Sequence, residues 1–147
     1  SWPSPAVAAD VLSRAGALAD VIVGNDEEFG FMAGGIEKGR AKALELAKTS
    51  AEIVVYKMGH LGAVTFADGV EITTGIFEVE AVKPTGAGDS FMAGFMAALS
   101  EGRDTRDAIL RGSACASIVV AQPGCAPPMP DTDQLDSFLL EHPGPTA

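Results

Sequence analysis

Short apolar runs that alternate with longer amphipathic segments are the feature that most limits how this chain can fold. Residues 21–23 and 53–56 are continuous apolar runs of the kind that is buried in a parallel sheet. Apolar residues at helical spacing occupy residues 5–18, behind a capping Ser4, and residues 36–49. Strands that alternate with helices predict an α/β fold with a mostly parallel sheet.

The middle of the chain departs from this pattern and predicts a short antiparallel hairpin. Apolar residues recur at every second position from 62 to 72, and Asp68-Gly69 interrupts them as a two-residue turn. The same alternation at residues 77–82 predicts further strand. Beyond it we expect helices over residues 90–99, 105–120 and 132–140, and Pro123-Gly124 ends the second of them.

The acidic composition limits the partners that this chain can bind. Its 147 residues are enough for one ordinary domain, and 20 acidic against 10 basic side chains give a formal charge of -10. Nucleic acids and anionic lipids are bound by clustered Lys and Arg, so we expect neither a nucleic acid nor a membrane as partner. Any bound anion must be held locally, by backbone amides, a metal or a few cations.

Cysteine content and the N-terminus predict a cytoplasmic protein. Cys115 and Cys125 are too few for a disulfide framework or a zinc site, and we interpret them as reduced thiols. No stretch approaches the roughly 18 consecutive apolar residues of a membrane helix, and the first residues lack the features of a signal peptide. We therefore expect a chain that is neither exported nor inserted into a membrane.

Three loops rich in Gly, Asn, Asp or Lys directly follow predicted strands. They comprise residues 25–28, 57–62 and 85–89. Ligands of α/β sheets bind beyond the carboxyl ends of the strands. We therefore expect the three loops to converge on one crevice.

The third loop predicts an anion-binding turn. Gly86 and Gly88 allow a sharp turn whose N–H groups point out of the following helix, where the helix dipole also favours an anion. Asp89 beside this turn could accept a proton from an attacking hydroxyl. The alternative is a plain tight turn with Asp89 as the helix N-cap, and spacing alone favours that alternative.

Neither of the common glycine-rich nucleotide motifs is present. No Gly-Lys-Ser/Thr follows the turn, which excludes a Walker loop, and residue 91 does not complete a dinucleotide fingerprint. Residues 24–27, after the first strand, do not form the glycine fingerprint of a Rossmann dehydrogenase either.

Residues 84–91, Pro-Thr-Gly-Ala-Gly-Asp-Ser-Phe, closely resemble the second signature of the ribokinase-like (PfkB) carbohydrate kinases. Residues 25–28 are similar to the family's N-x-x-E motif, and residues 57–62 to its T-x-G-x-x-G loop. Residues 112–116, with Gly124 and a proline-rich turn, resemble the segment that borders the adenine. The resemblance covers essentially the whole chain, and it implies a three-layer α/β/α ribokinase-like fold.

The resemblance also implies roles for individual residues. Asp89 would be the general base for a sugar hydroxyl, and the amides of Gly86, Ala87 and Gly88 would stabilise the transferred phosphoryl group. The other implied sites are water-mediated magnesium binding by Asn25 and Glu28, and contact with ATP by Lys57, Gly59, Gly62, Ser113, Cys115 and Ala116. For Asn25 and Glu28 the alternative is a helix cap and a solvated acidic turn, and for residues 57–62 it is a hairpin entry with a solvated Lys57. For residues 113–116 it is ordinary packing of small residues in a helix.

Finer details resemble the subfamily of 5-dehydro-2-deoxygluconokinases, which phosphorylate a sugar acid in inositol breakdown. These details are Lys57, the pair Lys83-Pro84, Gly124-Cys125 and Met129-Pro130. Fructokinase and 2-keto-3-deoxygluconate kinase remain alternatives. So does a non-catalytic nucleotide-binding remnant, although base, glycine turn and magnesium motif are all present together.

Family chains are about twice as long as this one, as expected for α/β kinases. Residues 1–147 resemble their C-terminal half, which binds the nucleotide and carries the base. We expect the sugar-binding half and its lid to be absent here, so that this chain alone is inactive, whereas the full-length enzyme can form a homodimer.

Lys83 marks a departure from the family pattern. Potassium-activated members place an Asp at this position, beside a bound monovalent cation. The Lys83 ammonium could replace that cation, and the alternative is a solvated residue at a strand end.

Overall fold

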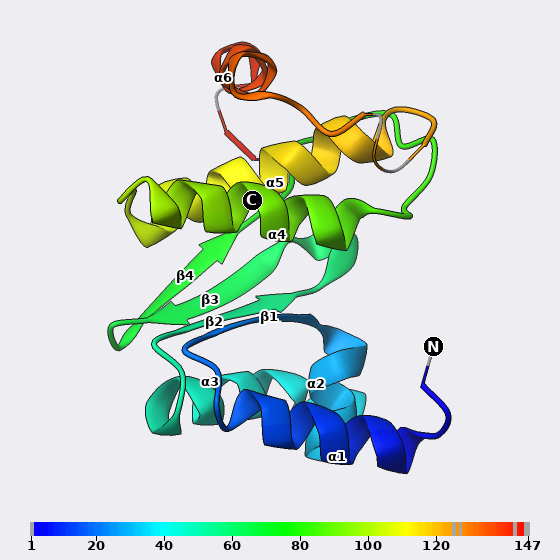
Figure 1. Ribbon diagram of the computed structural model, residues 1–147, viewed down its shortest axis with the longest axis vertical. Helices are drawn as coiled ribbons and strands as arrows, with labels where there is room; N and C mark the ends of the chain where they lie inside the picture. The colour runs from blue at the N-terminus through cyan, green and yellow to red at the C-terminus, as the bar shows by residue number, and fades with distance from the viewer. Residues whose placement is uncertain (1, 125, 127, 143, 146–147) are drawn as a thin grey trace. The chain divides into compact units, whose positions relative to one another are not determined.

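The computed structural model describes residues 2–124, 126, 128–142 and 144–145, so the predicted thiol Cys125 lies outside the described residues. The chain divides into two compact units, Ser1–Thr73 and Thr74–Ala147 (Figure 1). Each unit has its own helices and its own buried core, and each is described here by itself.

The first unit contains the sheet. Its elements are α1 (Pro5–Gly16), β1 (Val21–Asn25), α2 (Asp26–Ala33), the 3₁₀ turn η1 (Ile36–Lys38), α3 (Gly39–Thr49), β2 (Ile53–Lys57), the 3₁₀ turn η2 (Gly59–Leu61), β3 (Ala63–Ala67) and β4 (Val70–Thr74), which ends at the unit boundary. The strand order is β1-β2-β3-β4, with β1 parallel to β2 and β2 antiparallel to β3. Helices α1, α2 and α3 lie together beside the sheet (Figure 1).

The core of the first unit forms where α2 and α3 pack on the sheet. Phe29 of α2 and Tyr56 of β2 meet edge to face, with ring centroids 5.5 Å apart. Leu46 and Val54 belong to the same buried cluster. This packing explains the amphipathic pattern within α3, where Leu46 is buried and most charged residues stay in solvent, whereas Ile36 lies in η1 and is exposed.

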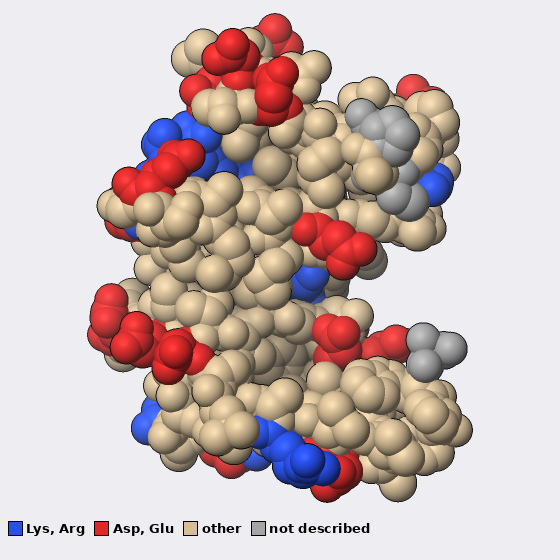
Figure 2. All heavy atoms as spheres, in the orientation of Figure 1, with Lys and Arg blue, Asp and Glu red and all other residues tan. Residues whose placement is uncertain are grey.

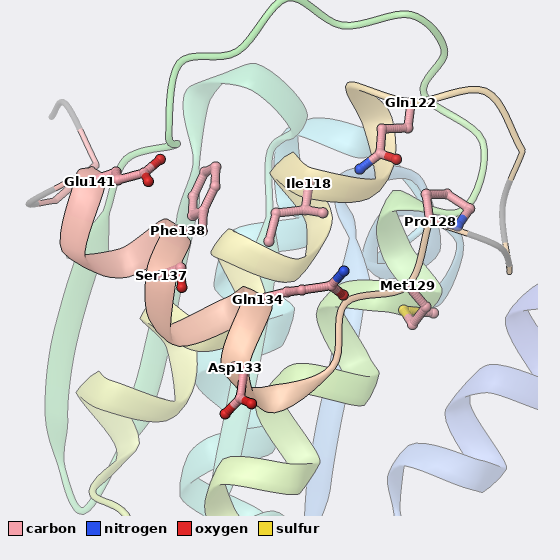
Figure 3. A pocket seen from close by; sticks show the side chains of 9 residues that line it. All are labelled: Ile118, Gln122, Pro128, Met129, Asp133, Gln134, Ser137, Phe138 and Glu141. Atoms are coloured by element: carbon pink, nitrogen blue, oxygen red, sulfur yellow. The ribbon is translucent and has the colours of Figure 1, made fainter.

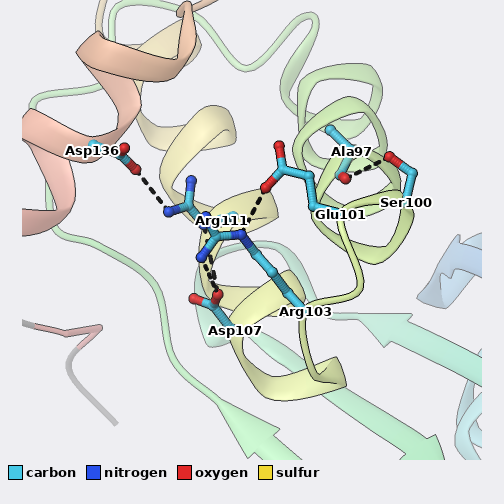
Figure 4. Close-up of polar contacts among 7 residues, drawn as sticks. All are labelled: Ala97, Ser100, Glu101, Arg103, Asp107, Arg111 and Asp136. Carbon is cyan, nitrogen blue, oxygen red and sulfur yellow. Dashed lines mark hydrogen bonds and ion pairs between the residues drawn. The ribbon is translucent and has the colours of Figure 1, made fainter.

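Among the residues that the structure describes, the regular elements lying wholly within the second unit are helices. It contains α4 (Ala87–Ser100), α5 (Thr105–Val120) and α6 (Thr132–Glu141). Glycines allow the close approach of α4 to α5: a Cβ on Gly94 would lie 2.6 Å from Cys115 Sγ, and one on Gly112 would lie 2.8 Å from the Phe91 carbonyl oxygen. Helix α6 is tied to α5 by the Arg111 Nη2–Asp136 Oδ1 ion pair at 2.7 Å (Figure 4).

Most of the expected elements are confirmed. Helix α5 covers Thr105–Val120 as expected, α1 begins behind the Ser4 cap, and Asp68-Gly69 forms a turn with both residues at positive φ. Helix α4 begins at Ala87, three residues before the expected start at residue 90. Among the described residues, none of the helices has the length and apolar character needed to cross a bilayer.

The expectation of strand at residues 77–82 is wrong. These residues form no strand, and the two ends of the segment are hydrogen-bonded to α5. The Ser117 hydroxyl donates to the Phe77 carbonyl at 3.3 Å, and the N–H groups of Val82 and Lys83 both donate to the Val120 carbonyl. Phe77 is buried but Val82 is 60% exposed, so the apolar alternation does not mark one buried face.

Candidate functional site

The first predicted loop is the cap of a helix that the sequence analysis missed. Asn25 ends β1 and is the N-cap of α2, and its Oδ1 accepts from the Glu28 N–H at 2.9 Å. Glu28 Oε2 accepts in return from the Asn25 N–H at 2.8 Å, which completes a capping box. The strand therefore passes directly into the helix and holds both side chains at the carboxyl end of β1.

A glycine in β1 makes room for this arrangement. A Cβ on Gly24 would lie 2.9 Å from Phe29 Cε2 and 3.2 Å from Glu28 Oε2. The absence of a side chain there lets the Phe29 ring enter the core and lets Glu28 reach back to Asn25.

The second predicted loop is a tight turn between β2 and β3. Lys57 is the last residue of β2 and is half-buried. Gly59 has φ 59 and Gly62 has φ 85 with ψ -141, conformations that L side chains rarely adopt. The Met58 N–H donates to the Gly62 carbonyl at 2.8 Å, which closes the turn.

Sheet register brings the first two loops together. Asn25 and Lys57 are Cα partners across the parallel pair β1–β2. The amide of Asn25 and the ammonium-bearing chain of Lys57 therefore begin from adjacent positions at one edge of the sheet. The sequence predicted this neighbourhood correctly for these two loops, and the convergence of the third loop on them stays a prediction.

The third predicted loop forms the head of α4. Gly86 is the N-cap in the left-handed conformation, with φ 93 and ψ -10. Asp89 lies in the first turn of the helix and is exposed. The alternative interpretation of Asp89 as the N-cap is wrong, because that position belongs to Gly86.

The three predicted amide donors are not equivalent. The Ala87 N–H donates to the Pro84 carbonyl at 3.2 Å, at the long end of the range for such bonds. The N–H of Gly88 lies in the first helical turn, where no earlier helical carbonyl exists to accept it. Gly88 is also exposed, so its amide is open to a bound anion.

The α5 candidates lie on two sides of their helix. Ser113 and Ala116 are half-buried and one turn apart, whereas Cys115 is buried in the core of the second unit beside Ala114 and Leu135. Burial raises the pKa of the Cys115 thiol, an effect that nearby Arg111 only partly opposes. A thiol of raised pKa is a poor nucleophile, so Cys115 does not suit nucleophilic catalysis.

An open groove of about 510 Å³ lies between α5 and α6 (Figure 3). Its lining residues are Ile118, Gln122, Pro128, Met129, Asp133, Gln134, Ser137, Phe138 and Glu141. Two of these are carboxylates and none is Lys or Arg, so the groove does not suit a triphosphate. No predicted site residue contributes to it.

Surface charge is consistent with local rather than global anion binding. On the face shown in Figure 2, Asp and Glu form several separate clusters, and Lys and Arg form only small groups. A phosphate group would have to be held by backbone amides and single cations.

The described residues contain no group of three or more His, Cys, Asp and Glu side chains that could cage a metal ion. The Asn25–Glu28 pair instead suits water-mediated binding of Mg²⁺. Glu28 uses Oε2 for the cap, so its other carboxylate oxygen can accept a hydrogen bond from a metal-bound water.

Comparison with known proteins places these features in context. The sequence pattern of the family described as "pfkB family carbohydrate kinase" matches residues 1–132. The 5-dehydro-2-deoxygluconokinase of Photobacterium profundum is 34% identical over 144 residues, which cover 95% of this chain and 44% of that protein. The 5-dehydro-2-deoxygluconokinase of Geobacillus thermodenitrificans is 35% identical over 147 residues, which cover 95% of this chain and 42% of the relative. This chain thus spans less than half the length of these curated relatives.

Solved structures show the same fold. A ribokinase from Thermotoga maritima has a TM-score of 0.76 at 27% identity, covering 82% of this chain and 42% of that one. The Arabidopsis thaliana ribokinase complexed with ribose and ATP has 0.73 at 28%, covering 82% and 40%. A fructokinase double mutant from Vibrio cholerae, with fructose, ADP and a potassium ion bound, has 0.78 at 28%, covering 94% and 46%. The expected ribokinase-like α/β fold class is confirmed.

The capping box generates a prediction about stability. Asn25→Ala should lower the free energy of unfolding by about 1 kcal/mol, because the Glu28 N–H loses its acceptor. Asn25→Ser keeps a neutral capping oxygen and should stay close to the unmodified chain. Urea unfolding followed by circular dichroism measures both. Equal midpoints for the Ala and Ser variants would contradict the role of the cap.

Proposed function

The chain belongs to the pfkB family of carbohydrate kinases, and from this membership we propose that the protein carrying it transfers the γ-phosphoryl group of ATP to a hydroxyl of 5-dehydro-2-deoxygluconate. The names of the curated relatives support this sugar acid as acceptor. In this proposal residues 1–147 supply the half that binds the nucleotide and carries the catalytic base. The residues that bind the sugar acid belong to a part of the protein outside this chain.

The observation that carries the proposal is the geometry at the head of α4. A left-handed Gly86 leads into the helix, and Asp89 follows in the first turn with an exposed carboxylate. Phosphoryl transfer needs a proton acceptor next to a site that stabilises negative charge. The turn offers both within four residues.

In the proposed reaction, Asp89 accepts the proton of the attacking sugar hydroxyl. The amides of Gly86, Ala87 and Gly88 donate to oxygens of the transferred phosphoryl group, and the positive end of the α4 dipole adds to this stabilisation. For the Ala87 N–H this means exchanging the long bond to Pro84 for a phosphoryl oxygen, because charge-assisted bonds are about twice as strong as neutral ones.

Asn25 and Glu28 would hold Mg²⁺ through its water shell. When bound, the ion neutralises charge on the phosphates of ATP. The part of this chain is to fix Asn25 and Glu28 in one position, and the capping box does so by tying each side chain to the backbone of the other residue.

Further residues are assigned to the nucleotide. Lys57, with the turn glycines Gly59 and Gly62, would contact phosphate and ribose. Ser113 and Ala116 would border the adenine with one face of α5, and Cys115 would support that face from the core of the second unit.

Fructose and 2-keto-3-deoxygluconate are the competing acceptors. The similarity to a fructokinase with bound fructose favours the first of them. A remnant that binds nucleotide without catalysis would keep ATP affinity and phosphorylate none of the three acceptors.

A coupled assay of ADP release tests the proposed function. With the complete protein, we expect turnover on 5-dehydro-2-deoxygluconate and a kcat/KM above that on fructose or 2-keto-3-deoxygluconate. Residues 1–147 alone should show no turnover, because they lack the proposed sugar-binding residues and the lid that would exclude water from the site. Turnover by this chain, free of complete protein, would contradict the proposed division of the enzyme.

Replacing the proposed base should abolish most of the activity. In the complete protein, Asp89→Asn should lower kcat by about 10²- to 10⁴-fold, because the amide cannot accept the hydroxyl proton, while ATP affinity stays nearly unchanged. Asp104→Asn is the matched control, since Asp104 is an exposed N-cap of α5 and Asn also caps. Steady-state kinetics and ATP titration measure both variants. More than a tenth of the original turnover in Asp89→Asn would contradict the assignment.

The proposed role of Lys83 predicts indifference to monovalent cations. Its backbone N–H donates to the Val120 carbonyl, which fixes the backbone from which the ammonium extends three residues before Gly86. The unmodified complete protein should have equal activity in sodium, potassium and tetramethylammonium buffers of equal ionic strength. Lys83→Asp should lower activity and create a dependence on potassium. Strong potassium activation of the unmodified protein would overturn this role.

A further inference from the structure

Ser90 is a fully buried polar residue that has no role in the proposed reaction as described above. Its side chain has 0% exposure at the start of a strongly apolar helix. A buried hydroxyl requires a partner, and this one has two carbonyls within reach. Ser90 Oγ lies 2.7 Å from the Gly86 oxygen and 3.1 Å from the Ala87 oxygen.

The shorter contact makes Gly86 the main acceptor. The Gly86 oxygen also accepts from the Ser90 backbone N–H at 2.9 Å. One residue thus holds the carbonyl of the left-handed N-cap with two hydrogen bonds. The two bonds fix the plane of the peptide group between Gly86 and Ala87.

The orientation of that peptide determines where the next amide points. In a trans peptide the C=O and the N–H point in opposite directions. Because the Gly86 oxygen points toward Ser90 in the helix, the Ala87 N–H points out of the helix end. It reaches the Pro84 oxygen at 3.2 Å, which agrees with this outward direction.

We propose that Ser90 is a positioning residue, which aims the Ala87 amide at the transferred phosphoryl group by holding the Gly86 carbonyl. This inference rests on the proposed kinase function. The hydroxyl does not touch the phosphate. It acts by reducing the freedom of a glycine, the residue with the largest backbone freedom, at the point where the amide must be aligned in advance.

The same helix offers a matched control at its other end. Ser100 Oγ donates to the Ala97 oxygen at 2.7 Å, a similar side-chain-to-backbone bond, but it is exposed and lies in the last turn of α4 (Figure 4). Removing the Ser100 hydroxyl deletes a bond of comparable length without touching the Gly86 turn.

The test compares Ser90→Ala, Ser90→Thr and Ser100→Ala in the complete protein. Ser90→Ala should lower kcat about 3- to 10-fold, as expected for one hydrogen bond, with KM for ATP and the melting temperature nearly unchanged. Ser90→Thr restores the hydroxyl and should recover kcat, and Ser100→Ala should behave as the unmodified protein. If the added methyl group of Thr lowers the melting temperature, the test rests on comparing kcat of Ser90→Ala with kcat of Ser100→Ala.

An unchanged kcat in Ser90→Ala would overturn the inference, as would an equal loss in Ser100→Ala. If the unmodified protein phosphorylates no sugar, the proposed function fails, and nuclear magnetic resonance still tests Ser90. In residues 1–147, Ser90→Ala should shift the Ala87 amide resonance and speed its hydrogen exchange, and Ser100→Ala should change neither. An unaffected Ala87 amide would show that Ser90 does not orient this peptide.

Discussion

The left-handed conformation of Gly86 is the constraint on which the proposed chemistry of the second unit depends. A residue with a side chain pays a steric cost at φ 93, so only glycine turns the chain sharply enough for α4 to begin at Ala87. That start places Asp89 in the first turn, where its carboxylate is exposed and points away from the buried face formed by Ser90 and Phe91. A start at residue 90, as the apolar run suggested, would have left Asp89 outside the helix.

In the first unit, too, the start of a helix fixes the proposed functional side chains, but through a side-chain cap. There a side chain, and not a glycine, begins the helix, because Asn25 caps α2 and Glu28 closes the box. Capping and the proposed magnesium role are compatible because a carboxylate has two oxygens and the cap uses only one. A structural and a functional role of such residues are therefore not exclusive alternatives.

Local patterns predicted much of the fold from sequence. Helix α1 begins behind the predicted cap Ser4, and α5 and α6 begin where apolar spacing placed them. The structure adds that Asp104 and Asp131 cap these two helices. Helix α2 was missed although Asn25 and Glu28 carry the spacing of a capping box, because the glycines around it suggested a loop. That spacing was the signal that could have found it.

What the sequence did not predict depends on contacts between distant residues. The apolar alternation at residues 77–82 has the period of a strand, but no pattern within six residues reveals that α5 supplies the hydrogen-bond partners. The neighbourhood of Asn25 and Lys57 was predictable by contrast, because parallel strands end at the same edge of a sheet. Nothing local shows that Cys115 faces Gly94.

Helix α5 connects these distant contacts in the second unit. Its Val120 carbonyl holds the chain just before the glycine turn, and Ser117 holds Phe77 further upstream. On another side, Gly112 lets the backbone of α4 approach at Phe91, immediately after Ser90. The turn at Gly86 is thus fixed from both directions by one rigid helix, through the segment that precedes it and through the helix that follows it. A substitution that shifts α5 would therefore also move Asp89, although the substituted residue does not contact Asp89.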